Sequence, residues 1–224
     1  MNKTKGLFIT ATGTDVGKTY VTGLIVKKMR DAGFNCGYYK GAISGADSVA
    51  QSDAGYVNKF AGIGQSEDSL VPYLYKEAVS PHLAAKIENK PIEMAVVKAG
   101  YAKNAASFNY LTMEGSGGIV CPIRHDDKEK IQLEDFIKEL SLPSLIVADA
   151  GLGTINYVVL TVEYMKARNL PIKAIILNNY SGGIMQEDNI KMIEEMTNIK
   201  VAALVKKGDT ELDIAAEALA AFYE

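Results

Sequence analysis

The amino-acid sequence predicts an α/β fold in which a mostly parallel sheet carries helices on both faces. Two observations support this prediction. Short apolar segments rich in strand formers alternate along the chain with segments whose apolar residues recur at helical spacing. The chain has 224 residues, 48% of them hydrophobic, which is enough to bury a sheet on both faces. No repeat or linker divides it, so we expect a single domain over residues 1–224.

The first half of the chain begins with a strand at residues 7–9, an apolar run of strand-forming residues. A helix with apolar residues at helical spacing follows it and ends near Gly33, which suits a helix C-terminus. Ser80 can cap a later helix in which Pro81 takes the first position. The other elements expected in this half are a strand at 36–40, helices at 52–60, 80–88 and 92–107, and a strand at 110–114.

The second half contains the most continuous apolar run of the chain, at residues 144–149, which is typical of a strand buried on both faces. An apolar stripe at helical spacing follows it at residues 155–165. The remaining elements expected are a helix at 133–140, strands at 172–177 and 201–205, and a helix at 212–222. Strands separated by helices favour a parallel sheet with right-handed crossovers.

The clearest functional motif is a variant phosphate-binding loop between the first strand and helix, which predicts the fold type of phosphate-loop NTPases. The chain passes from Gly13 through Gly17 to Lys18 and Thr19. In such loops backbone N–H groups and the helix N-terminus face phosphate oxygens, the lysine neutralises the outer phosphates and the threonine hydroxyl reaches Mg²⁺. The standard pattern has glycine where this chain has Thr12, so its first glycine comes one residue late. A chance Gly-Lys-Thr at a helix start is the alternative, but the flanking strand and helix favour the motif.

Polar residues at the ends of the other predicted strands gather near this loop, because the carboxyl ends of parallel strands share one edge. Asp53, Glu114 and Asp149 are candidate carboxylate ligands for a Mg²⁺ that the Thr19 hydroxyl also contacts. The pattern does not rank them, since such an acid can equally cap a helix or lie in a solvated turn. Lys40 either extends to water or meets a transferring phosphoryl group.

Composition argues against several classes of partner. The net charge of −3 and the pI of about 5.6 provide no basic field for nucleic acid. No segment approaches the about 20 apolar residues of a membrane span, and residues 1–5 lead into the first strand without an apolar signal segment. We therefore expect a cytoplasmic protein with no nucleic-acid or membrane partner. Cys36 and Cys121, with only two histidines, make a poor zinc set, so we expect reduced, structural thiols.

Several segments resemble, in the same order along nearly the whole chain, the motifs of dethiobiotin synthetases, the ATP-dependent ring-closing enzymes of biotin synthesis. They are ITATGTDVGKT at 9–19, YKGAISG at 39–45, SDA at 52–54, VSPH at 79–82, MEGSGG at 113–118 and LGTIN at 152–156, together with Asn178. Each segment alone is a weak signal, but six in register are specific.

The resemblance implies an enzyme that uses ATP and Mg²⁺ to convert 7,8-diaminononanoate and CO2 into dethiobiotin, ADP and phosphate. It also implies a homodimer with the diamine bound near the subunit boundary. Catalysis would depend on Lys40 and Lys18, and Thr19, Asp53 and Glu114 would hold the metal.

The resemblance further implies two sets of ligand contacts. Nucleotide-binding residues would be Gly13, Thr14, Asp15, Val16, Gly17, Lys18, Thr19, Tyr20, Asp53, Glu114, Gly115, Ser116, Gly117, Asn178 and Asn179. Substrate-binding residues would be Ser44, Gly118, Gly153, Thr154 and Asn156. Asp149 falls where the family usually has no acid, which favours a structural role for it.

The chain departs from the family pattern at four places. Gly41 replaces a proline after Lys40, which loosens the backbone where that lysine must be aimed. Asn179 replaces an aspartate, and residues 204–207 lack a proline near the base. The charged segment 122–127 matches no role of the family.

Two alternatives remain at this point. A partitioning or regulatory switch ATPase of the same superfamily usually carries a second lysine early in the loop, where this chain has Ala11, Thr12 and Gly13. It also needs a basic or amphipathic tail, which the sequence lacks. An amide-forming ligase that acts on another acid is the nearer alternative.

Overall fold

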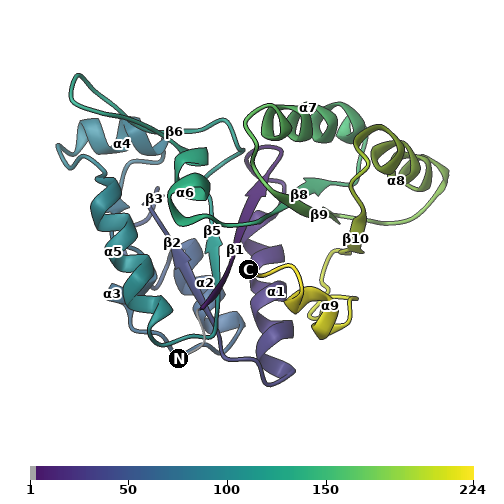
Figure 1. Ribbon diagram of the computed structural model, residues 1–224, viewed down its shortest axis with the longest axis horizontal. Coiled ribbons are helices and arrows are strands. Elements are labelled where there is room, and N and C mark those ends of the chain that lie inside the picture. Colours follow the sequence, from purple (N-terminus) through teal and green to yellow (C-terminus); the bar gives the residue numbers. More distant parts are fainter. Residues whose placement is uncertain (1–3) are drawn as a thin grey trace.

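A computed structural model describes residues 4–224, and at its centre lies a six-stranded sheet in which neighbouring strands are all parallel (Figure 1). The strand order is β10-β9-β8-β1-β5-β2. The strands are β1 (Lys5–Ala11), β2 (Cys36–Lys40), β5 (Tyr110–Glu114), β8 (Ser144–Asp149), β9 (Ile172–Asn178) and β10 (Val201–Leu204). The predicted α/β fold is confirmed. Residues 1–3, where the sequence predicts no signal segment, lie outside the described residues.

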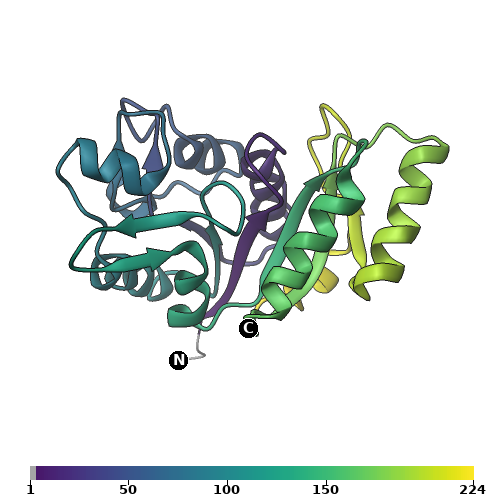
Figure 2. The ribbon, with the colours of Figure 1, turned by 90° about the horizontal axis from the view of Figure 1, so that it is seen from above.

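Helices cover both faces of the sheet, as Figure 2 shows from above. On one face lie α1 (Lys18–Asp31), α2 (Asp53–Phe60) and α9 (Ala216–Ala220), and on the other α5 (Met94–Ala105), α6 (Leu133–Leu140), α7 (Thr154–Lys166) and α8 (Ile184–Thr197). The side chains of β1 alternate between the two faces of the sheet. Leu7 and Ile9 pack in the core on the first face, and Phe8 packs in the core on the other face. All three side chains are fully buried.

Smaller elements lie beyond the carboxyl ends of β2 and β5, at the upper left of Figure 1. A short parallel pair joins β3 (Ile43–Ser44) to β4 (Leu74–Tyr75), and an antiparallel hairpin joins β6 (Pro122–His125) to β7 (Lys130–Gln132). Helix α4 (Pro81–Ile87) packs beside this hairpin, and α3 (Glu67–Leu70) precedes β4 in the chain. Of these elements, β3 contributes Ile43 and Ser44 to the wall of the cavity described below.

Several parts of the structure differ from the sequence-based prediction. The helix predicted at 212–222 is shorter, because Ala215 is extended, with ψ 136°, and α9 begins only after it. Leu212 is buried, at 1% exposure, in the segment that precedes α9. Helix α8 was not predicted, since its buried positions include Gln186, Asn189 and Thr197 and give no apolar stripe. The β6–β7 hairpin, the β3–β4 pair and α3 were not predicted either. The other predicted elements are present, with ends that differ by a few residues.

Among the helices of residues 4–224, none combines the length and the apolar composition needed to cross a membrane.

Candidate active site

The phosphate loop, residues 12–17, connects β1 to α1 at the carboxyl edge of the sheet. Gly17 and Asp15 both have positive φ, at 83° and 61°. A Cβ atom at Gly17 would lie 2.1 Å from Asn178 Nδ2, so only glycine allows this close approach. Asn178 Nδ2 also donates a hydrogen bond of 3.0 Å to the carbonyl oxygen of Val16. The loop is therefore fixed to the end of β9.

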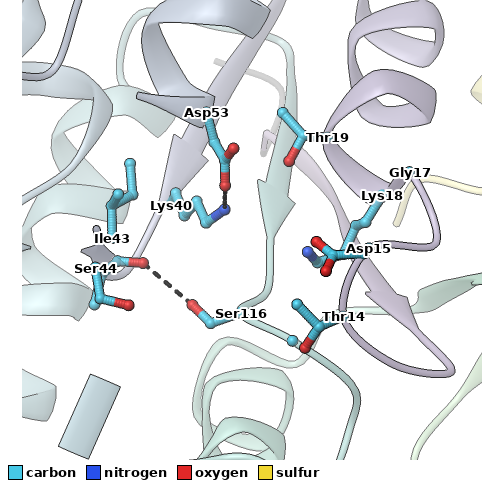
Figure 3. A pocket seen from close by; sticks show the side chains of 12 residues that line it. Thr14, Asp15, Gly17, Lys18, Thr19, Lys40, Ile43, Ser44, Asp53 and Ser116 are labelled. Carbon is cyan, nitrogen blue, oxygen red and sulfur yellow. Dashed lines mark hydrogen bonds and ion pairs between the residues drawn. The ribbon is translucent and has the colours of Figure 1, made fainter. Parts of the chain in front are cut away.

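Next to the loop, a buried lysine lies between two carboxylates, and Figure 3 shows its contact with one of them, Asp53. Lys40 Nζ is 2.5 Å from Asp53 Oδ2 and 2.7 Å from Glu114 Oε1. The Thr19 hydroxyl donates to the same Glu114 oxygen at 2.9 Å, and Lys18 Nζ lies 3.6 Å from it. Two carboxylates thus contact the Lys40 ammonium, and Glu114 also contacts the Thr19 hydroxyl and the Lys18 ammonium.

The strand register explains how these residues meet. Lys40 at the end of β2 is paired in register with Glu114 at the end of β5, which in turn is paired with Ile9 of β1. Tyr38 lies two residues before Lys40, on the same face of β2, and its hydroxyl donates to Glu114 Oε2 at 3.3 Å. Sequence reasoning missed Tyr38, although the period of two along the strand was an available signal. Asp53 enters the cluster from the first turn of α2.

Opposite charges decide the protonation of the cluster. Burial by itself lowers the pKa of Lys40, but the carboxylates of Glu114 and Asp53 outweigh burial and raise this pKa overall. Burial likewise raises the pKa of Asp53, yet the Lys40 ammonium lowers it overall. Burial lowers the pKa of Lys18, and Glu114 offsets part of that effect. Lys40 and Asp53 are therefore a charged pair at neutral pH.

A cavity of about 450 Å³ joins this cluster to the phosphate loop. Figure 3 shows Ser44 and Ser116 on one side of it and Asp15 on the other. The Ser44 hydroxyl donates to the Val79 carbonyl at 2.6 Å, and the Ser116 hydroxyl donates to that of Ala42 at 3.2 Å. The lining residues are Thr14, Asp15, Gly17, Lys18, Thr19, Lys40, Ala42, Ile43, Ser44, Asp53, Ser116 and Gly117.

At the end of β9 lie two predicted nucleotide-binding residues, of which Asn178 keeps an acceptor atom without a partner among the described residues and Asn179 has a partner. Asn178 is 4% exposed, and its Oδ1 is buried with no hydrogen-bond partner among the described residues. A buried acceptor of this kind is costly unless a ligand satisfies it. Asn179 instead donates its Nδ2 to Asp149 Oδ2 at 2.6 Å, and Asp149 Oδ1 accepts the Gly151 N–H at 2.7 Å. Asp149 therefore fixes a turn.

Other predicted contacts lie outside the cavity. Gly153 and Asn156 are exposed at the start of α7, and Thr154 is buried there. Gly13 and Gly118 line a different cavity of about 440 Å³ together with Leu160 of α7. The predicted nucleotide contacts Val16, Tyr20 and Gly115 also fall outside the lining of the first cavity. One chain therefore does not bring the α7 residues to Lys40.

The position of Gly41 also has a structural explanation. A Cβ atom at residue 41 would lie 2.7 Å from Cε2 of Phe136, a side chain of α6 that is 2% exposed. The Phe136 ring thus occupies the space beside the backbone that follows Lys40. The sequence does not reveal this contact, because the two residues are distant in the chain.

A glycine-containing loop between a parallel strand and a helix, with a lysine and hard oxygen ligands at the same edge, defines a nucleotide-binding protein of the phosphate-loop class. A family model described as an AAA domain matches residues 5–210. The ATP-dependent dethiobiotin synthetase BioD of Brachyspira hyodysenteriae is 54% identical over 210 residues, which are 93% of this chain and 95% of that protein. BioD of Clostridium botulinum is 48% identical and covers 98% of both chains. The chain belongs to the family of ATP-dependent dethiobiotin synthetases.

Solved structures with a similar fold have much lower sequence identity. A plasmid partition protein from Borrelia burgdorferi is 12% identical, with a TM-score of 0.61 over 99% of this chain and 98% of that one. The MinC:MinD cell division protein complex of Aquifex aeolicus, also 12% identical, gives a TM-score of 0.57 over 96% and 92%. At this identity the similarity supports the fold alone.

Proposed function

We propose that the protein converts 7,8-diaminononanoate and CO2 into dethiobiotin, with ATP cleaved to ADP and phosphate. The observation that carries this proposal is the buried Lys40 in a cavity with the phosphate loop on one side and Ser44 on the other. A nucleotide switch needs no such lysine, whereas a ligase needs a cation between the γ-phosphate and the group that accepts it. The family to which the chain belongs supports the same conclusion.

The chemistry explains why ATP is needed. One amine of the diamine attacks CO2, forms a C–N bond and loses a proton, which gives a carbamate anion. The second amine cannot displace oxide from that anion. A carbamate oxygen therefore attacks the γ-phosphorus, and the bond to ADP breaks. The second amine then attacks the activated carbon and closes the ring, while phosphate leaves with the former carbamate oxygen.

Two lysines suit the charge changes in this sequence of steps. Lys18 follows the phosphate loop, and Lys40 approaches the same Glu114 oxygen as Lys18 at the cavity, so both are positioned to stabilise charge on the transferring phosphoryl group. The diamine must also lose protons, since an alkyl amine with a pKa of about 10.4 is protonated at neutral pH. Neighbouring ammonium charges and a dry cavity lower an amine pKa.

The residues around Lys40 also fit a magnesium ion. Mg²⁺ prefers one or two carboxylates with other hard oxygen ligands, and Asp53, Glu114 and Thr19 supply two carboxylates and a hydroxyl. The two carboxylates already bind one cation, the Lys40 ammonium, and the Thr19 hydroxyl bonds to Glu114 beside it. When bound, Mg²⁺ would neutralise charge on the β- and γ-phosphates. We propose that Lys40 then turns from the carboxylates toward the phosphoryl group.

We expect Asp53→Asn and Glu114→Gln each to raise the Mg²⁺ concentration needed for half-maximal turnover by at least about tenfold, because each removes a direct oxygen ligand. Magnesium titration of the steady-state rate at saturating ATP measures this effect. Asp149→Asn is the matched control, since Asp149 bonds the Gly151 backbone and Asn179 and should leave the magnesium requirement unchanged. A magnesium shift confined to Asp149→Asn would contradict the assignment.

For the other ligand contacts we propose two further roles. Asn178 Oδ1, which lacks a partner among the described residues, would accept a hydrogen bond from the adenine amino group. Gly153, Thr154 and Asn156 would reach a diamine bound to a second copy of the chain. Exposed apolar side chains support such a homodimer. Leu152, next to Gly153, is 89% exposed, and Leu160 and Val120, which line the cavity of about 440 Å³ beside α7, are 62% and 64% exposed.

We expect Leu160→Arg to convert the dimer into a monomer and to abolish most dethiobiotin formation while the phosphate loop still binds ATP. A charged side chain in an apolar contact is left desolvated and unpaired. Light scattering after size exclusion gives the mass, and calorimetry gives ATP affinity. Ile87→Arg is the control, because Ile87 is also half exposed but belongs to α4. An unmodified chain that is already monomeric at assay concentration, and active, would contradict the proposed dimer.

We also expect the enzyme to work in the cytoplasm. Cys36 and Cys121 are free and buried, and burial raises the pKa of each thiol to about 11. Such thiols stay protonated and are compatible with a reducing compartment.

The reaction is tested by incubating the purified chain with ATP, Mg²⁺, bicarbonate and 7,8-diaminononanoate, and by omitting each in turn. Dethiobiotin measured by mass spectrometry should equal the phosphate released, and both should vanish with any omission. Phosphate release that ignores the diamine would favour a switch ATPase. No reaction in any mixture would favour an amide-forming ligase that acts on another acid.

A further inference from the structure

A second cavity, of about 410 Å³, lies between α4 and the β6–β7 hairpin. His82 and His125, the only two histidines of the chain, both line it. It shares no lining residue with the cavity at the phosphate loop. Residues 124–127 of the charged segment, to which the proposed function gives no role, form one wall of the cavity.

Arg124 is the buried charge of this wall, with 8% exposure. Its Nε donates to Asp126 Oδ2 at 2.7 Å, and its Nη1 donates to Glu129 Oε2 at 3.0 Å and to the Ile92 carbonyl at 3.3 Å. Its Nη2 donates to none of residues 4–224, so the guanidinium keeps free donors at the cavity. A guanidinium whose orientation is fixed by other bonds is a suitable donor to phosphate or carboxylate oxygens.

The acids around Arg124 are largely used by the hairpin itself. Asp126 Oδ1 accepts the backbone N–H groups of Lys128 and Glu129 at 2.9 and 2.8 Å, which closes the turn. The Arg124 guanidinium and these backbone donors lower the pKa of Asp126 to about 2, so Asp126 stays ionised in its turn. The other acid that lines the cavity is Asp127, and its side chain is exposed.

The opposite wall adds further positive charge. Lys86 of α4 is exposed and has no carboxylate partner within the described part of the chain. His82 uses Nδ1 in a 3.0 Å contact with the Ser80 hydroxyl, which leaves Nε2 for a ligand. On the hairpin wall, next to Arg124, His125 is exposed at the end of β6. Donors from two separate elements therefore face one cavity.

We propose that the cavity between α4 and the β6–β7 hairpin is a second ligand site, which binds a small molecule through a phosphate or carboxylate group. Within residues 4–224, Lys86 supplies the unpaired positive charge, Arg124 supplies free guanidinium donors although Asp126 and Glu129 balance its charge, and the two histidines supply hydrogen bonds from either wall. The site is independent of the proposed synthetase reaction, because it uses none of the residues at the phosphate loop.

The two histidines make the test direct, because every imidazole signal of the untagged chain comes from this cavity. Inorganic phosphate, and separately succinate, is titrated into the labelled full-length protein while the imidazole ¹H–¹³C signals are recorded. We expect both signals to shift with one saturation curve for at least one probe. The responding probe identifies the phosphate or carboxylate class. The titration is repeated with Lys18→Ala, in which phosphate binding at the loop is weakened.

Variants keep the test decisive. Lys86→Ala should weaken binding of the probe by about tenfold, the loss expected for one charge-assisted hydrogen bond. Arg124→Gln should weaken it at least as much, but Arg124 also stabilises the hairpin, so Lys86→Ala is the cleaner variant. Lys191→Ala, an exposed lysine of α8, is the matched control and should bind as the unmodified chain does. Signals that neither probe moves, or binding that Lys86→Ala leaves unchanged, would overturn the proposal.

Discussion

Lys40→Ala is expected to slow turnover by about 100-fold or more and to bind ATP nearly as tightly as the unmodified chain. Lys40 is 3% exposed and held by Asp53 and Glu114, so its charge acts in a site shielded from water, where a cation has its largest effect. The positive charge of Lys40 is needed most when negative charge builds on the transferring phosphoryl group. Its removal therefore lowers the turnover rate and leaves ATP affinity nearly unchanged. Stopped-time assays give turnover and calorimetry gives ATP affinity.

Removal of Lys40 also leaves the buried Glu114 without its nearest cation, and loss of a buried ion-pair partner destabilises a fold by about 3–5 kcal/mol in general. Thermal unfolding of the variant therefore accompanies the assay, and Lys40→Gln, which keeps a hydrogen-bond donor, provides a second test. The control is Lys98→Ala, whose half-exposed ion pair with Glu139 lies on the surface. Turnover near that of the unmodified chain in a folded Lys40→Ala variant would mean that Lys40 has only a structural role.

Lys18→Ala is expected to lose ATP affinity and turnover together, each by about tenfold or more, because Lys18 contacts phosphate oxygens before and during transfer. Lys18 lies at the start of α1 and keeps 10% side-chain exposure toward the cavity. Calorimetric titration with ATP measures the first loss and the omission assay the second. Lys27→Ala, a lysine of the same helix that pairs with Asp31, is the matched control. Unchanged ATP affinity in Lys18→Ala would contradict the phosphate-loop assignment.

The sheet could be predicted because strands such as β8 and β9 contain a continuous apolar run. In β8 the residues from Leu145 to Ala148 are all fully buried, which leaves a strong local signal in the sequence. Helix α8 gave no such signal, since Gln186 and Asn189 are buried there and form hydrogen bonds. Gln186 accepts the N–H groups of Ser181 and Gly182, and Asn189 donates to Ala150. A helix that buries amides shows no apolar periodicity.

The site was predictable to the extent that it is local in sequence. The loop from Gly13 to Thr19 carries its own chemistry, so its place followed from the motif. The cluster of Lys40 and Glu114 depends on the register of β2 against β5, which no local pattern specifies. The contact between Gly41 and Phe136 likewise depends on how α6 packs over the sheet. Motif order indicated which residues gather, but not the bonds between them.

The transfer of oxygen from CO2 to phosphate tests the central claim most directly, because in the proposed reaction the carbamate oxygen attacks the γ-phosphorus and leaves on it. Freshly dissolved ¹⁸O-labelled CO2 is mixed with the protein, ATP, Mg²⁺ and 7,8-diaminononanoate in unlabelled water, and the reaction is stopped before the label exchanges. We predict one ¹⁸O atom in each phosphate released, in step with dethiobiotin formation. Phosphate that forms without the label would contradict the account, because its oxygen would then come from water.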